Sequence, residues 1–140
     1  MKRRAFLPLI FIPVAKAGES EKATIRGKLD QTAGNPPKLI DSSGKPIQLS
    51  GDEPTRGVLG DPRLKDADFE VSGHFTTPGS FEIDPIHTRS LFAYRDGKRL
   101  MVTYWCAICY IRTYTPGSCW CCQEWTDLDL RPPDAPDPKP

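Results

Sequence analysis

Apolar and polar side chains alternate with a period of two over much of the chain after residue 22. In residues 23–30, the odd-numbered positions are apolar or glycine, and positions 24, 26 and 28 are polar. Such alternation predicts a half-buried β-strand, because successive side chains of a strand point to opposite faces. The same reasoning predicts strands at residues 38–41, 45–50, 68–75, 80–86, 90–94, 99–105 and 110–114. No segment has the 3.6-residue stripe of a long amphipathic helix, so we expect a mostly β fold.

Turn residues separate the predicted strands. Ser42-Ser43-Gly44 lies between two strands and indicates a hairpin, and Asp96-Gly97 is a strong signal for a type I′ turn. Residues 51–66 lack alternation, and we expect one short helical turn there, around residues 55–59. The acidic residues of this segment are typical of helix caps, and they do not form a recognisable pair of general acid and base.

The layout of residues 23–95, short strands with one irregular segment in the middle, resembles the OB-fold, a small five-stranded Greek-key barrel. It is also similar to small exported bacterial domains of unknown function in which an OB-like barrel precedes a cysteine-rich end. The resemblance implies a fold and very little about activity, because this fold hosts many unrelated functions. We therefore expect an OB-like domain over residues 18–98, followed by a cysteine-rich segment, residues 99–130, packed on it.

The five cysteines all lie between Cys106 and Cys122, and four of them form the pattern C-x2-C-x9-C-x2-C. Two residues between sulfurs let a tight turn aim both at one point, and two such turns supply the four thiolates of a tetrahedral metal site. The predicted ligands are Cys106, Cys109, Cys119 and Cys122, with Cys121 or His87 as substitutes. The segment 104–124 resembles the knuckle pair of a zinc ribbon or rubredoxin.

Four hypotheses describe the chemistry of this site. Zinc bound by four thiolates is structural, since no ligand position stays open, whereas iron in the same cage is a one-electron carrier. The third hypothesis is a pair of disulfides, because thiols outside the cytoplasm are normally oxidised. The fourth is thiol-redox or copper chemistry. No nucleophile motif, phosphate loop or cysteine–histidine offset accompanies the cysteines, so we predict no catalytic residue and no enzyme activity.

Aromatic residues are frequent around the cysteines: Trp105, Tyr110, Tyr114, Trp120 and Trp125. They could shield the sulfurs of a metal site from water. We nevertheless expect them to be the buried core of the C-terminal segment, because aromatic side chains are the usual large buried groups.

The N-terminal residues have the order of a signal peptide. Two arginines and a lysine precede a short apolar run, and Ala15-Lys16-Ala17 is a cleavage pattern. The run Arg3-Arg4-Ala5-Phe6-Leu7 also resembles the twin-arginine export signal, and an ordinary secretory signal is the alternative. We predict cleavage of residues 1–17 and a periplasmic or secreted protein with no stable membrane insertion.

Cleavage changes the sign of the net charge. The whole chain has 19 basic and 18 acidic residues, and the predicted signal removes four basic residues and no acid, which leaves a formal charge near −3. Such a chain lacks the basic stripe of a nucleic-acid groove, so the expected partner is an envelope protein or a small ligand. Residues 131–140 contain five prolines, which predicts a disordered tail.

Overall fold

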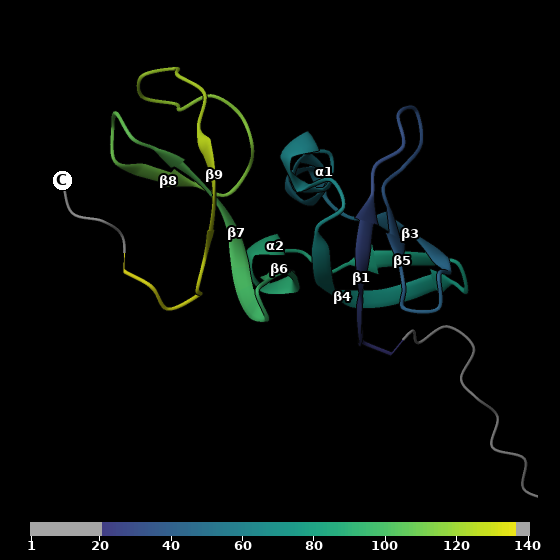
Figure 1. Ribbon diagram of the computed structural model, residues 1–140. Helices are drawn as coiled ribbons and strands as arrows, with labels where there is room; N and C mark the ends of the chain where they lie inside the picture. The colour runs from purple at the N-terminus through teal and green to yellow at the C-terminus, as the bar shows by residue number, and fades with distance from the viewer. Residues whose placement is uncertain (1–20, 137–140) are drawn as a thin grey trace, which may run out of the picture.

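The computed structural model describes residues 21–136, and its strands form one continuous sheet (Figure 1). The predicted signal peptide and the last four residues of the predicted tail lie outside the described residues. The strands are β1 (Ala23–Asp30), β2 (Lys38–Ile40), β3 (Pro46–Ser50), β4 (Asp68–Thr77), β5 (Ser80–Ile83), β6 (Leu91–Arg95), β7 (Lys98–Cys106), β8 (Ile111–Thr113) and β9 (Asp127–Arg131). The helical elements are α1 (Glu53–Leu59), the 3₁₀ turn η1 (Pro62–Leu64) and α2 (His87–Ser90).

Five strands close into a barrel in the order β1-β2-β3-β5-β4, and β4 returns to pair with β1. All neighbours in this circle are antiparallel except β3 and β5, which are parallel. The helical segment stands between β3 and β4 in the chain. The predicted mostly β fold with a five-stranded barrel is thereby confirmed.

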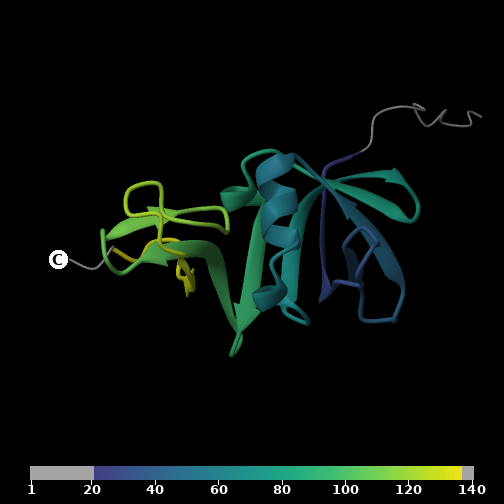
Figure 2. The same ribbon diagram turned by 90° about the horizontal axis from the view of Figure 1, so that it is seen from above.

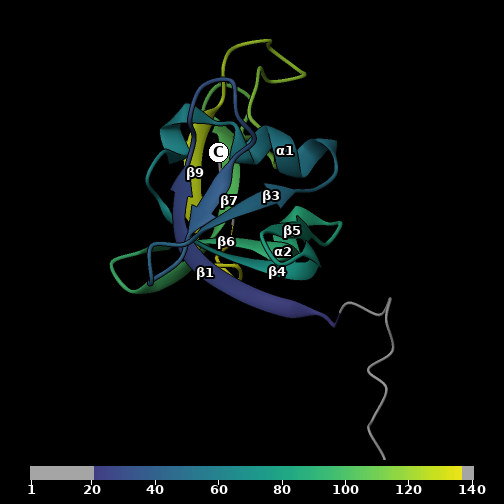
Figure 3. The ribbon, with the colours of Figure 1, turned by 90° about the vertical axis from the view of Figure 1, so that its right-hand side faces the viewer.

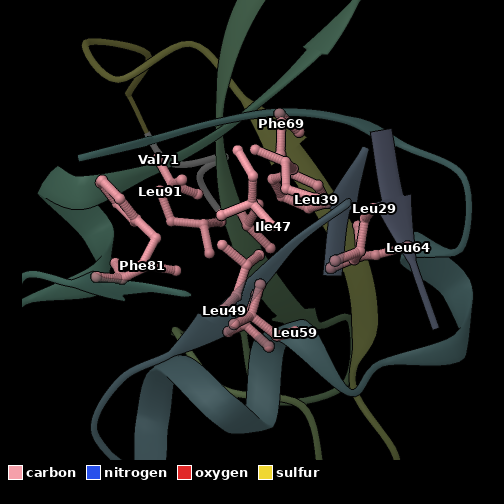
Figure 4. Packing of buried hydrophobic residues seen from close by; sticks show 14 of the residues in the cluster. Leu29, Leu39, Ile47, Leu49, Leu59, Leu64, Phe69, Val71, Phe81 and Leu91 are labelled. Atoms are coloured by element: carbon pink, nitrogen blue, oxygen red, sulfur yellow. The ribbon is translucent and has the colours of Figure 1, made fainter. Parts of the chain in front are cut away.

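The barrel is filled by the apolar positions of the alternating pattern (Figure 4). Leu29 and Leu39 are opposite each other on β1 and β2, Leu49 and Phe81 on β3 and β5, and all four are almost fully buried. Gly73 of β4 pairs with Ile83 of β5, and a Cβ at position 73 would collide with the backbone of Glu82. Closing so small a barrel requires tight strand crossings, and this one leaves no space for a side chain.

The helical segment covers one end of the barrel (Figures 1 and 3). Asp52 caps α1 by accepting hydrogen bonds from the backbone N–H and the hydroxyl of Thr55, at 3.0 and 2.6 Å. Val58 and Leu59 then point into the core. The short helical turn expected near residues 55–59 is confirmed, and the acidic residue before it has the capping role that such residues usually have.

The long strand β7 connects the barrel to the cysteine-rich end (Figure 2). Its first half pairs with β6, and its second half pairs with β8 on one side and β9 on the other. Its inward residues Val102 and Tyr104 belong to the barrel core, whereas its last residue is Cys106. The predicted division between residues 98 and 99 falls at the start of this shared strand. We call residues 106–131 the cysteine module.

Two elements differ from the sequence-based expectation. Strand β9 was not predicted; it uses Leu128 and Leu130 to pack against the barrel core. The short helix α2 starts within a region expected to link two strands, after Ile86, whose φ of 65° is in the left-handed region.

Candidate metal centre

Four cysteines meet at the far end of β7. Cys106 is the last residue of this strand, and a four-residue turn brings Cys109 back beside it. Strand β8 then leads away, and an irregular loop returns with Cys119 and Cys122 before β9 begins. The sulfur atoms of these four residues all lie within 4.8 Å of one another. The sequence prediction of which cysteines converge therefore agrees with this grouping.

The spacing of the sulfurs suits a metal ion better than disulfide bonds. The Sγ atoms of Cys106 and Cys122 are 3.5 Å apart, and all five cysteines are free thiols. A disulfide requires about 2.05 Å between sulfurs. A tetrahedral zinc site with zinc–sulfur bonds of about 2.3 Å has sulfur–sulfur edges of about 3.8 Å. The four thiols therefore fit a four-coordinate ion with little rearrangement.

The two C-x2-C turns share one backbone design. The N–H of Tyr110 donates to the carbonyl oxygen of Cys106 at 2.9 Å, and the N–H of Gln123 donates to that of Cys119 at 2.8 Å. Tyr110 and Gln123 both adopt left-handed backbone conformations, with φ of 54° and 64°. Each turn thus closes over four residues and places a positive-φ residue directly after its second cysteine. Glycine adopts this conformation without strain, and a glycine after each second cysteine would have marked the two turns as similar. Because Tyr110 and Gln123 stand there instead, the similarity is not visible in the sequence.

Backbone N–H groups point at the buried sulfurs. The N–H of Cys109 lies 3.4 Å from the Sγ of Cys106, and the N–H of Cys121 lies 3.4 Å from the Sγ of Cys119. Such donors favour the thiolate, which is the form that binds metals. Hydrogen bonds from the backbone of Cys122 and Cys121 lower the pKa of the Cys119 thiol to about 7.

The centre has a buried side and an open side. Cys106 and Cys119 are buried, Cys109 and Cys122 are half-buried, and Cys121 is exposed. On the open side, the neighbouring thiol of Cys121 raises the pKa of the Cys109 thiol. Cys121 stands next to the four-sulfur group and is not one of its members.

His87 lies between the barrel and the cysteine module, outside the four-sulfur group. It begins α2, it is buried, and its Nε2 atom is 2.6 Å from the carbonyl oxygen of Tyr114. Its position joins α2 to the loop that follows β8.

The aromatic residues correct one expectation. Trp120 and Trp125 are 75% and 66% exposed, and Tyr110 and Tyr114 are also exposed, so these four do not form a core. Trp105 is half-buried and meets the ring of Tyr110 edge-on at 5.8 Å. The buried side chains of residues 106–131 are those of Cys106, Cys119 and Thr126. Because its buried side chains are two cysteines and a threonine, this segment has little apolar volume in which to bury a tryptophan.

A polar network that the sequence did not predict fastens the module to the barrel. The buried carboxylate of Asp61 accepts hydrogen bonds from the Tyr104 hydroxyl at 2.8 Å and from the Arg63 guanidinium at 3.0 Å. Arg63 also donates to the carbonyl oxygen of Thr126 at 2.9 Å. Burial by itself raises the pKa of Asp61, but the hydrogen bonds from Arg63 and Tyr104 outweigh it and hold that pKa below its usual value.

A second network connects β7 with its neighbours β8 and β9. Arg112 of β8 donates to the Thr103 hydroxyl at 2.6 Å and to the Asp129 carboxylate at 2.9 Å. Its guanidinium also stacks over the ring of Trp105, 4.8 Å from the centroid. Because Thr103 and Asp129 come from β7 and β9, Arg112 links the three strands that carry the cysteine turns.

Comparisons with other proteins add no family to this description. A scan against protein-family models, a search of curated proteins and a search of solved structures each found no significant match. Among residues 21–136, no helix is long and apolar enough to cross a membrane.

Proposed function

We propose that the protein is an exported, non-catalytic binding or accessory module whose cysteine end is held together by a structural zinc ion. The observation that carries the proposal is the set of four cysteine sulfurs within 4.8 Å of one another. Four protein thiolates complete the coordination of zinc, so no position remains for water or a substrate. The ligands are Cys106, Cys109, Cys119 and Cys122, and their role is to bind zinc and so replace an apolar core.

Iron in the same cage is the second candidate, which makes the protein an electron carrier. The observation that favours it is the pair of N–H···Sγ contacts to Cys106 and Cys119, because hydrogen bonds to sulfur are one of the means by which proteins set the potential of iron–sulfur centres. The half-exposed Cys109 and Cys122 also bring the centre close to the surface, where an electron can leave.

The binding role is supported by the surface of the cysteine module. Seven large apolar side chains of the described residues are exposed, and five of them fall between residues 108 and 125. Large apolar side chains gathered on one part of a surface are typical of interaction sites. An envelope protein is the partner we propose for this surface, with a small ligand as the alternative; the negative charge of the cleaved chain argues against nucleic acid.

Native mass spectrometry of the exported protein, purified without chelator, tests the proposal. Export predicts a chain that starts at Gly18, and the metal centre predicts one additional zinc ion that is lost on denaturation. All five thiols should then react with an alkylating agent. One iron in place of zinc, with visible absorption, supports the electron carrier instead.

A different mass contradicts the metal centre. A metal-free chain that is four hydrogens lighter than the reduced chain, with a single thiol open to alkylation, indicates two disulfides. The Cys121→Ser variant is the matched control, because it removes a cysteine that is outside the four-sulfur group and should keep the metal.

A further inference from the structure

Strand β9 forms an edge of the sheet. It pairs with β7, and within residues 21–136 no strand lies on its other side. An edge strand of this kind can accept a further strand through its backbone N–H and C=O groups. Two prolines follow Arg131, and the chain turns there, because the N–H of Ala135 donates to the carbonyl oxygen of Pro132 at 3.1 Å. Proline cannot donate to a strand ladder, so the open edge is limited to the five residues of β9.

The side chains of β9 are arranged so that the strand complements itself. In order they are Asp127, Leu128, Asp129, Leu130 and Arg131. A second copy that runs antiparallel and is centred on Asp129 places Asp127 opposite Arg131, twice, and Leu128 opposite Leu130, twice. Within one chain the two charged ends are four residues apart, about 13 Å along a strand, which is too far for an ion pair. Opposite each other on two strands, their Cβ atoms are about 5 Å apart, which is close enough for one.

We propose that two copies of this chain pair through β9, antiparallel and centred on Asp129, to form a symmetric dimer with one continuous sheet. Because both copies use the same strand, the contact closes on itself and does not extend into a filament. The inference goes beyond the proposed function: it concerns the edge of the sheet, and it requires neither the exposed tryptophans of the cysteine module nor a particular metal.

The surroundings of these side chains agree with such a pairing. Asp127 is exposed, and its carboxylate makes no ion pair or hydrogen bond within residues 21–136. Leu128 and Leu130 are half-buried against the barrel core, so leucines of a second copy would cover apolar surface that is still open to water. Arg131 donates to the carbonyl oxygen of Pro136, and the five N–H donors of a guanidinium allow it to bind a carboxylate as well.

The central residue of the proposed pairing needs a counter-charge. Asp129 lies opposite the Asp129 of the second copy, and like charges directly opposite each other destabilise a strand pair. The carboxylate of Asp129 already accepts a hydrogen bond from Arg112 at 2.9 Å, and the side chain of Arg112 is only 7% exposed. Each copy therefore brings its own cation to the centre of the dimer, and the four groups together are neutral.

Sedimentation velocity of the purified mature protein over a range of concentrations tests the proposal. Two five-residue strands bury less surface than a standard interface, so we expect a monomer at low concentration and a dimer at high concentration. Asp127→Arg and Arg131→Asp each turn both opposite-charge pairs into like-charge pairs, and each should raise the dissociation constant of the dimer about tenfold or more. Asp134→Arg is the matched control, because Asp134 is also an exposed acid but lies beyond the strand; it should dimerise like the wild type.

A mixture of the two single variants gives the sharpest result. Asp127→Arg carries two cations at the ends of β9, and Arg131→Asp carries two anions, so each variant repels itself and complements the other. We expect the equimolar mixture to form a heterodimer at concentrations at which each variant alone is a monomer. This recovery also shows that both variants are folded, because a misfolded strand could not pair.

Three results would overturn the inference. They are a wild type that stays monomeric at the highest concentration, single variants that dimerise as strongly as the wild type, and a mixture that stays monomeric. The second result would assign the dimer to another surface. The zinc content of each sample is measured as well: a monomer with one zinc ion leaves the proposed function standing, whereas a wild type without metal contradicts the proposed metal centre and not the dimer.

Discussion

The barrel and the cysteine module are held together by different means. The barrel encloses a continuous cluster of apolar side chains contributed by its strands and α1. The cysteine module buries two cysteines and one threonine, and it leaves two tryptophans, two tyrosines and an isoleucine exposed. A chain folds where buried apolar area offsets the loss of conformational entropy, and the module cannot meet that condition with side-chain packing alone. In the cysteine module, the sulfur cluster therefore occupies the place that the apolar cluster has in the barrel.

The largest expected effect comes from breaking the sulfur cluster. Chelation of the metal, or Cys119→Ser, should unfold the loop around β8 and leave the barrel folded. Structural zinc sites carry about 10–16 kcal/mol of apparent binding free energy in small peptides, and the module has little else to replace it. Hydrogen exchange followed by mass spectrometry checks this: amides of residues 107–124 should lose protection, while those of β4 keep it. Cys121→Ser, with the four ligands intact, serves as the control, and loss of protection throughout the chain would contradict the division.

The reverse experiment weakens the barrel. Phe81→Ala removes a fully buried ring that also meets Phe75 edge-on at 5.0 Å, and we expect a loss of about 3–5 kcal/mol in the free energy of unfolding. Chemical denaturation measures this loss, and Trp120→Ala, a large but exposed residue of the module, should change it by no more than about 0.5 kcal/mol. Zinc stoichiometry of Phe81→Ala under native conditions should remain one per chain. Loss of zinc in a folded barrel variant would show that the module depends on the barrel core.

The alternation of apolar and polar residues predicted strands of the barrel but not the pairing of β9. Strand β1 was predicted with the observed bounds, because burial on one face imposes a period of two. The closed barrel was expected from the resemblance of the strand layout to the OB-fold. Strand β9 has the same alternation in Leu128 and Leu130 but is short, and its pairing site exists only because β7 extends beyond the barrel. Pairing between such distant segments is not visible in a local pattern.

The cysteine site shows the same limit. Spacing identified the four sulfurs that converge, since two-residue spacing constrains a turn directly. Burial of the aromatic residues was predicted wrongly for Trp120 and Trp125, because hydrophobicity alone does not tell whether a segment has an interior. The anchoring role of Asp61 was also missed. Its partners Arg63 and Tyr104 are brought together by the barrel end, and the sequence offered only the capping signal of an acid before a proline.

The joint between the two regions should respond to a smaller change and to pH. Tyr104→Phe removes the hydroxyl that donates to Asp61, and we expect a loss of about 1.5–3 kcal/mol, since the acceptor is charged and buried. The folded-state pKa of Asp61 is lowered, so its contribution to stability is present above the unfolded value of about 3.9 and is lost as the pH falls through the folded value. Unfolding free energies measured from pH 7 down to pH 2 check both effects.

Asp61→Asn provides the control for this joint. The amide cannot ionise, so the acid-dependent part of the stability should shrink relative to the wild type. Asp68→Asn, in the exposed pair between Asp68 and Arg26, should change the profile far less, because exposed ion pairs contribute about 0–1 kcal/mol. Identical acid profiles for the wild type and Asp61→Asn would mean that the network holds no titrating group.

The smallest effect concerns the backbone of the two turns. Gln123 is exposed and has a φ of 64°, a conformation that costs a non-glycine residue roughly 1 kcal/mol. Gln123→Gly should therefore raise stability by up to about 1 kcal/mol, or leave it unchanged where the greater entropy of glycine in the unfolded chain cancels the gain. Glu124→Gly is the matched control, because Glu124 is also exposed and is not among the positive-φ residues, so glycine there should destabilise by about 0.5–1 kcal/mol. Denaturation of the zinc-loaded protein measures the difference. If Gln123→Gly destabilises the protein as much as Glu124→Gly does, the left-handed backbone of Gln123 carries no strain. The two turns then have the same hydrogen bonds but no preference for glycine after the second cysteine.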